Sequence, residues 1–267
     1  MPAHLQPEAA EHWILVHTAK HRRLNRLLRS ADRRVFGGVA VVVCLVAVLI
    51  AAVTVGWILD TVESNRGFAR WDSTVADWGA AHSSSLSTRV LRTVTHLGDT
   101  IVVVVAMGLV AAFDFRRFRN AGVIGFMVTV ALGVNVLNNS LKWLVERERP
   151  GVAHLIGSAG SSFPSGHSAM AAAGWAAIAL VLGRTWPHRR RQLAAGAVVI
   201  ALTVATSRAL LGVHWLTDVI AGVIVGWAWF FVVAVIFGGR LQRFGDPAVR
   251  DSRSLERSEP ADLPADV

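Results

Sequence analysis

The sequence predicts an all-α integral membrane protein, a bundle of six transmembrane helices with a short extracytoplasmic helical segment between the first and second helices. Hydrophobic residues make up 53% of the 267 residues, charged residues make up 17%, and the mean hydropathy is +0.47. Soluble domains are roughly 45–50% apolar and about 25% charged. The apolar residues lie in long runs, and lysines and arginines cluster between alternate runs. These features indicate a chain that crosses a bilayer several times.

Six apolar runs account for the spans, because a helix needs about 20 apolar residues to cross a ~30 Å hydrocarbon core. The run at 36–58 follows a long N-terminal segment and exceeds the apolar region of a signal peptide, so we expect a transmembrane helix there. The run at 101–113 is too short alone and needs residues 93–100 to complete a span. The later runs, which flanking residues can extend, lie at 121–141, 169–182, 194–211 and 219–237.

The basic residues predict the orientation of these spans. They cluster at 20–34, 116–119, 184–191 and 240–257. The positive-inside rule places such clusters in the cytoplasm. We therefore expect a multi-pass plasma-membrane protein with cytoplasmic termini.

Three regions follow from this topology. A basic cytoplasmic segment covers 1–35, the membrane domain covers 36–238, and a disordered cytoplasmic tail of mixed polar composition covers 239–267. Within the first region, residues 11–28 form either a basic amphipathic helix on the membrane surface or a solvated stretch that only sets the topology.

Composition also excludes several classes of function. Cys44 is the only cysteine, so the chain has no internal disulfide, no cysteine-based zinc site and no CxxC redox motif. The net charge of +9 could attract nucleic acid. Because the cations lie in short loops beside apolar runs, topology explains them better, and we expect a lipid partner and no nucleic acid.

Three polar motifs lie at the predicted extracytoplasmic ends of helices three to six, at residues 142–150, 164–167 and 207–218. Charged groups near membrane depth are costly and suggest a function. Lys142, Arg149 and Arg208 can neutralise a phosphate. Ser165 and Gly166 open a helix, where free backbone N–H groups and the helix dipole favour an anion.

The histidines add chemistry to this anion site. His214 and Asp218 are four residues apart on one helical face, so the carboxylate can orient the imidazole as a nucleophile. His167, in the facing motif, is a candidate acid for the leaving oxygen.

Each feature alone also has a structural explanation. Lys142 or Arg149 could be a snorkelling anchor, and His214 with Asp218 could be a helix-capping pair. We expect ordinary loop roles for His82, His96 and His154. Solvated rim charges paired with Arg147 are expected at Glu146 and Glu148. A small-residue packing face is expected at Gly222 and Gly226. Asp99, near a span end, has no assigned role.

The order K-x6-RP, PSGH, SR-x5-H-x3-D resembles the three-part signature of the type 2 phosphatidic acid phosphatase family. The wider superfamily includes lipid phosphate phosphatases, bacterial undecaprenyl pyrophosphate phosphatases and vanadium haloperoxidases. The resemblance implies a six-helix membrane phosphatase that needs no metal and no cofactor. It implies that His214 forms a phosphohistidine, that Asp218 orients it, and that His167 protonates the leaving group and then activates water. It also implies that the phosphoryl oxygens are held by Lys142, Arg149, Ser165, Gly166 and Arg208.

We therefore expect hydrolysis of the terminal phosphate of a lipid (di)phosphate, such as undecaprenyl pyrophosphate, phosphatidate or phosphatidylglycerophosphate. A non-catalytic transporter of anions or lipid phosphates is the alternative, in which the cations only bind. The histidine pair favours the enzyme, because binding alone needs cations and amides but no oriented imidazole. Six spans argue against a haloperoxidase, because those proteins resemble soluble enzymes.

Overall fold

The computed structural model describes residues 41–64, 66–152, 157 and 160–245, with side chains described as far as Phe237. The predicted segment 1–35, the tail beyond residue 245 and His154 lie outside the described residues. The chain divides into two compact units, Met1–Val46 and Ala47–Val267. The three motifs and the helices that carry them belong to the second unit.

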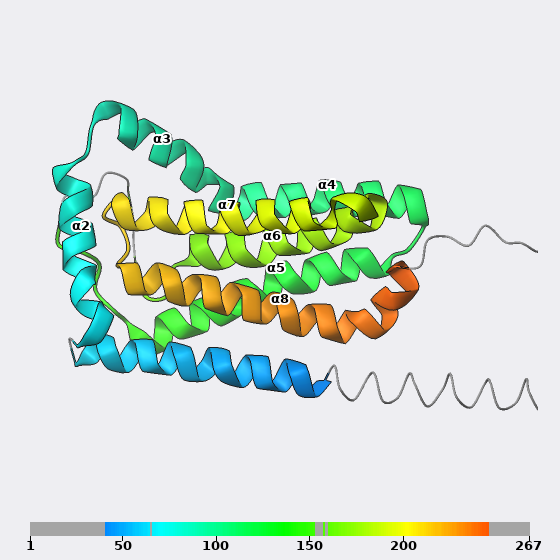
Figure 1. Cartoon of the computed structure of the whole chain (residues 1–267), viewed down its shortest axis with the longest axis horizontal. Coiled ribbons are helices and arrows are strands. Elements are labelled where there is room, and N and C mark those ends of the chain that lie inside the picture. Colours follow the sequence, from blue (N-terminus) through cyan, green and yellow to red (C-terminus); the bar gives the residue numbers. More distant parts are fainter. Residues whose placement is uncertain (1–40, 65, 153–156, 158–159, 246–267) are drawn as a thin grey trace, which may run out of the picture. The chain divides into compact units, whose positions relative to one another are not determined.

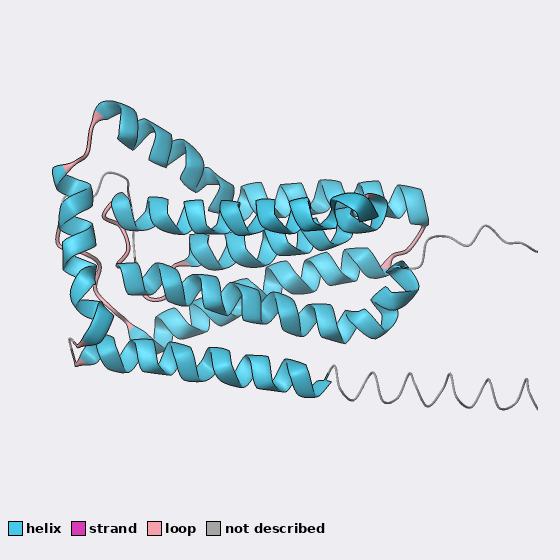
Figure 2. Ribbon diagram, viewed as in Figure 1, coloured by secondary structure: helices cyan, strands magenta, loops and turns pink. Residues whose placement is uncertain are grey.

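Every regular element in the described part of the chain is a helix, which confirms the all-α prediction (Figure 2). The first span is Val41–Glu63. It is followed, in the order shown in Figure 1, by η1 (Gly67–Arg70), α2 (Trp71–Ala81), α3 (Ser85–Thr95), η2 (His96–Gly98), α4 (Thr100–Phe118), α5 (Gly122–Val145), α6 (Gly166–Thr185), η3 (Pro187–Arg189), α7 (Arg190–Leu210) and α8 (Leu216–Gly245).

Five helices are long and apolar enough to cross a membrane alone, and a sixth span is a bent pair. The pair joins Ser85–Gly98 to Thr100–Phe118 at an angle of 51°. The bend lies at Asp99, whose extended backbone (φ −62°, ψ 131°) interrupts the helix. Asp114, Arg116 and Arg117 shorten the apolar part of α4, so this span needs its upstream segment, as its sequence predicts.

Local signals explain where the other helices begin and end. Arg119 (φ 53°) and Glu146 (φ 45°) adopt the left-handed conformation that ends α4 and α5. Ser165 caps α6 by accepting a hydrogen bond from the backbone of Ser168. The apolar span of α8 ends at Phe237, but the helix continues to Gly245, into the stretch assigned to the tail.

The centre of the bundle is α6, which contacts α4, α5, α7 and α8. Glycines on α8 allow a close approach of α6 and α8. A Cβ on Gly222 would lie 2.5 Å from the Ser165 carbonyl oxygen, and one on Gly226 would lie 2.3 Å from that of Ala169. The predicted packing face at Gly222 and Gly226 is therefore confirmed. Through these glycines, the start of α8 packs against the start of α6, where two of the three motifs lie.

The predicted helical segment between the first two spans is also present, as η1 and α2. Helix α2 contacts α7 and α8. A Cβ on Gly79 would lie 2.6 Å from the carbonyl oxygen of Leu210. This close packing brings α2 beside the loop that joins α7 to α8.

Candidate active site

The three motifs meet at one end of the helical bundle, where α5 and α7 end and α6 and α8 begin (Figure 1). The Lys142 ammonium donates to the carbonyl of Ser161 at 2.5 Å. Arg149 Nη1 lies 3.4 Å from His214 Nε2. The first and third motifs therefore share one site, and the second joins them because Ser165 N donates to the carbonyl of Asp218 at 3.0 Å.

His214 and Asp218 are buried side by side, with 3% and 0% of their surfaces exposed. His214 Nδ1 lies 3.6 Å from Asp218 Oδ2, which is too long for a hydrogen bond. Nδ1 has no hydrogen-bond partner among the residues that the structure describes. Catalytic hydrogen bonds are often long in unliganded enzymes and tighten with substrate. The pair is thus placed for the expected contact without yet making it.

Other groups hold the Asp218 carboxylate in place. Oδ2 accepts hydrogen bonds from the hydroxyl of Ser162 and from Trp215 N, the latter at 2.9 Å. Oδ1 accepts from Arg147 Nη1 at 2.5 Å. With these donors, Asp218 has little freedom to turn, so the neighbouring imidazole has a fixed negative charge beside it.

His214 is neutral over the ordinary pH range. Burial lowers the pKa of its imidazole from 6.5 to about 4, against the opposing effect of Asp218. Nε2 faces a guanidinium N–H of Arg149, an environment that suits a lone pair. Nδ1 faces the carboxylate, which suits the N–H. With this assignment, the Nε2 lone pair faces the cations of the site.

Backbone carbonyls fix two of the three expected phosphate-binding cations. Arg149 donates Nη1 to Val213 O at 2.5 Å and Nε to Gly160 O at 3.0 Å. Burial lowers the pKa of Arg149, but a guanidinium stays charged near neutral pH. The Lys142 ammonium is held by Ser161 O. Carbonyl acceptors carry no net charge, so these contacts orient the two cations at the site.

Arg208 is the most buried of the three cations, with 5% of its surface exposed, in the last turn of α7. Its Nη1 lies 3.5 Å from Thr95 Oγ1, and its buried Nε has no hydrogen-bond partner within the described part of the chain. A buried N–H without a partner costs about 1–3 kcal/mol. A bound oxyanion would satisfy this group and offset the charge.

The start of α6 faces the same cluster. Gly166 is the first helical residue, and a Cβ there would lie 3.1 Å from the side-chain nitrogen of Asn138. The first backbone N–H groups of a helix have no acceptor within it. The Ser165 hydroxyl caps the helix and also accepts from Ser168 Oγ at 2.9 Å. An anion here would therefore meet backbone N–H groups at the helix start.

His167 has a carboxylate partner that sequence reasoning did not assign. Its Nε2 lies 2.6 Å from Asp99 Oδ1, and Asp99 Oδ2 lies 2.6 Å from His96 Nδ1. The expectation that His96 is an ordinary loop residue is therefore wrong. His96 and Asp99 are an i, i+3 pair at the bend before α4, a spacing that could have suggested their contact. The link to His167 spans 68 residues, which no local pattern reveals.

Arg147 also differs from its prediction. We expected it to pair with Glu146 and Glu148, but it bridges two buried carboxylates instead. Nη2 donates to Asp72 Oδ2 at 2.8 Å and Nη1 donates to Asp218 Oδ1 at 2.5 Å. The physical reason is the left-handed backbone at Glu146, which ends α5 and changes the direction of the chain. The side chains of Glu146 and Glu148 are exposed, whereas that of Arg147 is largely covered.

Asp72, on α2, completes this arrangement. It accepts hydrogen bonds from Thr217 N at 2.9 Å and from Thr217 Oγ1 at 2.6 Å, and only 4% of its surface is exposed. The neighbouring residue of Thr217 is Asp218, so Asp72 and Arg147 together fix the first turn of α8. No motif in the sequence marks Asp72.

Comparisons with known proteins identify relatives of this chain. The model of the PAP2 superfamily matches residues 122–242. Phosphatidylglycerophosphatase B of Bacillus subtilis is 34% identical over 164 residues, covering 58% of this chain and 77% of that protein. Decaprenylphosphoryl-5-phosphoribose phosphatase of Mycobacterium tuberculosis is 34% identical over 157 residues, covering 56% of this chain and 80% of that protein.

A solved structure is similar as well. The crystal structure of the transmembrane PAP2-type phosphatidylglycerolphosphate phosphatase from Bacillus subtilis superposes with a TM-score of 0.68 at 27% sequence identity. The match covers 74% of this chain and 98% of that chain. The similarity therefore includes the helical bundle as well as the three motifs.

Proposed function

Since this chain belongs to the PAP2 superfamily, we propose that its site hydrolyses the terminal phosphate of a lipid (di)phosphate through a phosphohistidine intermediate. The chain is a multi-pass membrane protein and a metal-independent lipid phosphate phosphatase. The observation that carries the mechanism is the buried His214 beside Arg149, together with Arg208, whose buried Nε has no hydrogen-bond partner among the described residues.

In the first step, the Nε2 lone pair of His214 attacks phosphorus. The P–N bond forms while the bond to the leaving oxygen breaks, and His167 gives its proton to that oxygen. The imidazole gains positive charge, and the Asp218 carboxylate stabilises that charge through Nδ1–H. Asp218 remains ionised, because Arg147, Ser162 and Trp215 N all donate to it.

In the second step, water attacks the phosphohistidine. His167, now neutral, takes a proton from the water as the new P–O bond forms. The P–N bond breaks, its electron pair returns to Nε2, and inorganic phosphate leaves. Both histidines recover their starting protonation states, so the cycle needs no further reagent.

Charge stabilisation supplies much of the catalysis in phosphoryl transfer, because negative charge spreads over the three equatorial oxygens. Lys142, Arg149 and Arg208 are the cations available to meet that charge, together with the N–H groups that open α6. The carbonyl contacts of Lys142 and Arg149 hold these groups before substrate arrives, and such preorganisation favours the transition state.

The relatives differ in the lipid named, phosphatidylglycerophosphate for one and a decaprenyl phosphoribose for another. The substrate class proposed here is accordingly a lipid with a terminal phosphate, including phosphatidylglycerophosphate, phosphatidate and undecaprenyl pyrophosphate. Phosphate release by the purified protein in detergent, measured on each of these lipids, identifies the substrate.

One pair of variants tests the mechanism. We expect His214→Ala to abolish phosphate release. His82→Ala is the control and should keep the rate of the native protein, because His82 is exposed and stacks on Trp78. Near-normal hydrolysis by His214→Ala would exclude the phosphohistidine. If no lipid phosphate were hydrolysed but one crossed the membrane of a proteoliposome, the transporter alternative would hold.

We also propose that the site faces the extracytoplasmic side of the plasma membrane and that both termini are cytoplasmic, from the distribution of basic loops. In a Cys44→Ala background, a cysteine at Ser85 should react with an impermeant thiol reagent in intact cells, and one at Gln192 should not. Both positions are exposed on the protein. The reverse labelling pattern would place the site on the cytoplasmic side.

A further inference from the structure

A second cavity lies at the other end of α6 from the active site. Its volume is about 610 Å³, within the usual size of small-molecule sites. Helix α6 begins with Gly166 at the active site, and Arg184 at the cavity is 18 residues further on, or about 27 Å along the helix at 1.5 Å per residue. The two sites are therefore separate.

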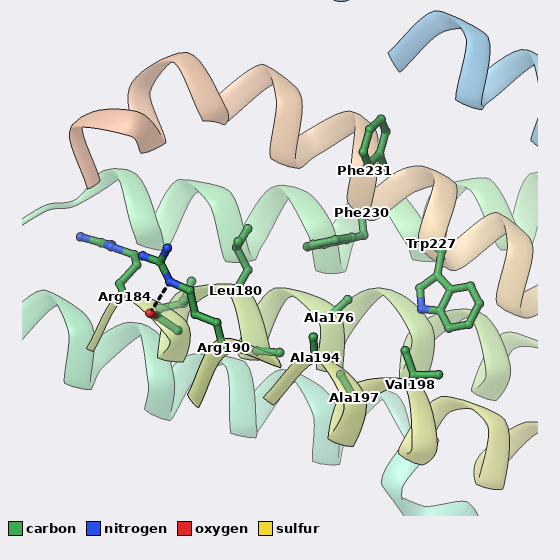
Figure 3. A pocket seen from close by; sticks show the side chains of 13 residues that line it. Ala176, Leu180, Arg184, Arg190, Ala194, Ala197, Val198, Trp227, Phe230 and Phe231 are labelled. Carbon is green, nitrogen blue, oxygen red and sulfur yellow. Dashed lines mark hydrogen bonds between the residues drawn. The ribbon is translucent and has the colours of Figure 1, made fainter. Parts of the chain in front are cut away.

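The cavity has one cationic end and one apolar end. Figure 3 shows the guanidinium groups of Arg184 and Arg190 together at one end and Trp227 at the other. Phe230 and Phe231 of α8 line the part between them. Leu180 of α6 and Val198 of α7 line the cavity and are each 40% exposed, so the cavity reaches the outer surface of the bundle. On a membrane protein, that surface faces lipid chains.

The two arginines differ in their charge balance. Arg184 Nη1 donates to the buried carboxylate of Asp114 at 3.0 Å, so its charge is compensated. Arg190 donates Nε to the carbonyl of Gly183 at 2.9 Å. A carbonyl fixes the guanidinium but cancels none of its charge, and its two terminal nitrogens have no hydrogen-bond partner among the described residues.

The position of Arg190 depends on a glycine. A Cβ on Gly183 would lie 3.0 Å from Arg190 Cγ, so the absence of that atom lets the arginine lie across the end of α6. The guanidinium is thereby held at the mouth of the cavity with two N–H-bearing nitrogens available. A fork of this kind matches the oxygens of a phosphate.

We propose that this cavity binds an anionic phospholipid, with its phosphate on Arg190 and an acyl chain along the apolar wall formed by Ala194, Trp227 and Phe230. The ligand is an amphiphile because one end of the cavity is cationic and the remainder is apolar. It is anionic because Arg190 carries charge that no residue at the cavity neutralises. It comes from the leaflet at the helix ends opposite the active site. The site is distinct from the phosphatase site and does not depend on the phosphohistidine mechanism.

The test is the thermal stability of the purified full-length protein in a neutral detergent, titrated with dioleoylphosphatidylglycerol or dioleoylphosphatidylcholine. The anionic lipid should raise the melting temperature at lower concentrations than the zwitterionic one. Arg190→Gln should weaken the apparent affinity for phosphatidylglycerol about tenfold, and Arg190→Lys, which keeps the charge but lacks the guanidinium fork, should restore only part of it. Arg191→Gln is the matched control, because Arg191 is exposed and does not line the cavity.

A second pair of variants tests the apolar wall. Ala194→Phe should fill the cavity and weaken the binding of phosphatidylglycerol, whereas Ala195→Phe, exposed but outside the cavity, should not. Phosphate release should stay unchanged in all these variants, which shows that they remain folded. Equal losses in Arg190→Gln and Arg191→Gln would indicate adsorption to basic surface and would overturn the proposal. A change of oligomeric state in Ala194→Phe without any lipid effect would assign the cavity to a second copy of the chain.

Discussion

Asp99 Oδ1 lies 2.6 Å from Nε2 of His167, and His96 contacts the other oxygen of the same carboxylate. A carboxylate at this distance orients the imidazole and stabilises its protonated form. The proposed general acid needs both properties. Asp99 is hydrogen-bonded to His167, whereas Asp218 lies 3.6 Å from His214, so a carboxylate faces each of these two histidines.

Asp99→Asn should therefore impair His167 as the general acid. We expect kcat to fall about 10–100-fold, within the range that general acid catalysis contributes. The alkaline limb of the pH profile should move to lower pH, because the imidazolium loses its stabilising charge. A pH series of lipid phosphate hydrolysis measures both effects. His96→Gln should have a much smaller effect, because His96 is 66% exposed. An unshifted alkaline limb would show that Asp99 has only a structural role.

Arg147 is expected to matter for stability. Arg147→Gln leaves Asp72 and Asp218 buried without their shared cation, and loss of one partner from a buried ion pair costs about 3–5 kcal/mol. Thermal unfolding in detergent should show a large drop in melting temperature. Glu148→Gln is the matched control, and we expect a change within about 0.5 kcal/mol because Glu148 is exposed. Similar losses in the two variants would contradict the bridging role.

The pH dependence of kcat/KM should reflect the buried imidazole. His214 must be neutral to attack, and burial lowers its pKa from 6.5 to about 4. The acid limb should accordingly have its midpoint near pH 4 and not near 6.5, because kcat/KM reports the free enzyme.

The lowered pKa of His214 also makes the free energy of unfolding depend on pH. The unfolded chain binds a proton at His214 between about pH 6.5 and pH 4 while the folded protein does not, so this residue's contribution to stability falls as the pH decreases through that window. Melting temperatures of the native protein and of His214→Gln, compared from pH 7 to pH 4, measure the contribution. An acid limb centred between pH 6 and 7 would contradict the effect of burial.

Close packing of α6 on α8 supports the site, and replacing glycines at this contact with alanine tests it. Gly222→Ala places a Cβ 2.5 Å from the carbonyl oxygen of Ser165, the residue that caps α6, so the helices must move apart. Overpacking of this kind costs about 1–3 kcal/mol, and phosphate release should fall because Asp218 begins the same helix.

Gly196→Ala is the control for this packing. Gly196 lies in α7, and a Cβ there would have no neighbour within 4 Å. Alanine should be neutral or stabilising by up to about 1 kcal/mol, because it is the better helix former. If the two alanine variants behaved alike, the close approach of α6 and α8 would not be needed.

Vanadate and chelators test the chemistry of the site. Vanadate can adopt the trigonal-bipyramidal geometry of phosphorus in the transition state, so it should inhibit at concentrations well below those of phosphate. His214→Ala should lose this tight binding, as measured by isothermal titration calorimetry. Activity should survive treatment with EDTA, because the cations of the site supply the positive charge. Loss of activity with EDTA and its return with a divalent metal would refute the proposed mechanism.

Patterns among residues that are neighbours in the sequence predict much of this protein's fold. Hydropathy is a property of neighbours along the chain, so the spans could be predicted, including the need of the run at 101–113 for its upstream segment. Counting the spans then places Lys142, His167 and His214 at the same end of the bundle. Gly222 and Gly226 could be assigned to a packing face from their spacing alone.

Contacts between distant segments decided the rest. Arg147 reaches Asp218 and Asp72 across 71 and 75 residues, and His167 reaches Asp99 across 68. The charge of Arg147 could equally have been matched by the glutamates beside it. Only the turn at Glu146, the bend at Asp99 and the packing of α2 on α7 select the actual partners, because a side chain pairs with the groups that the folded backbone brings within reach.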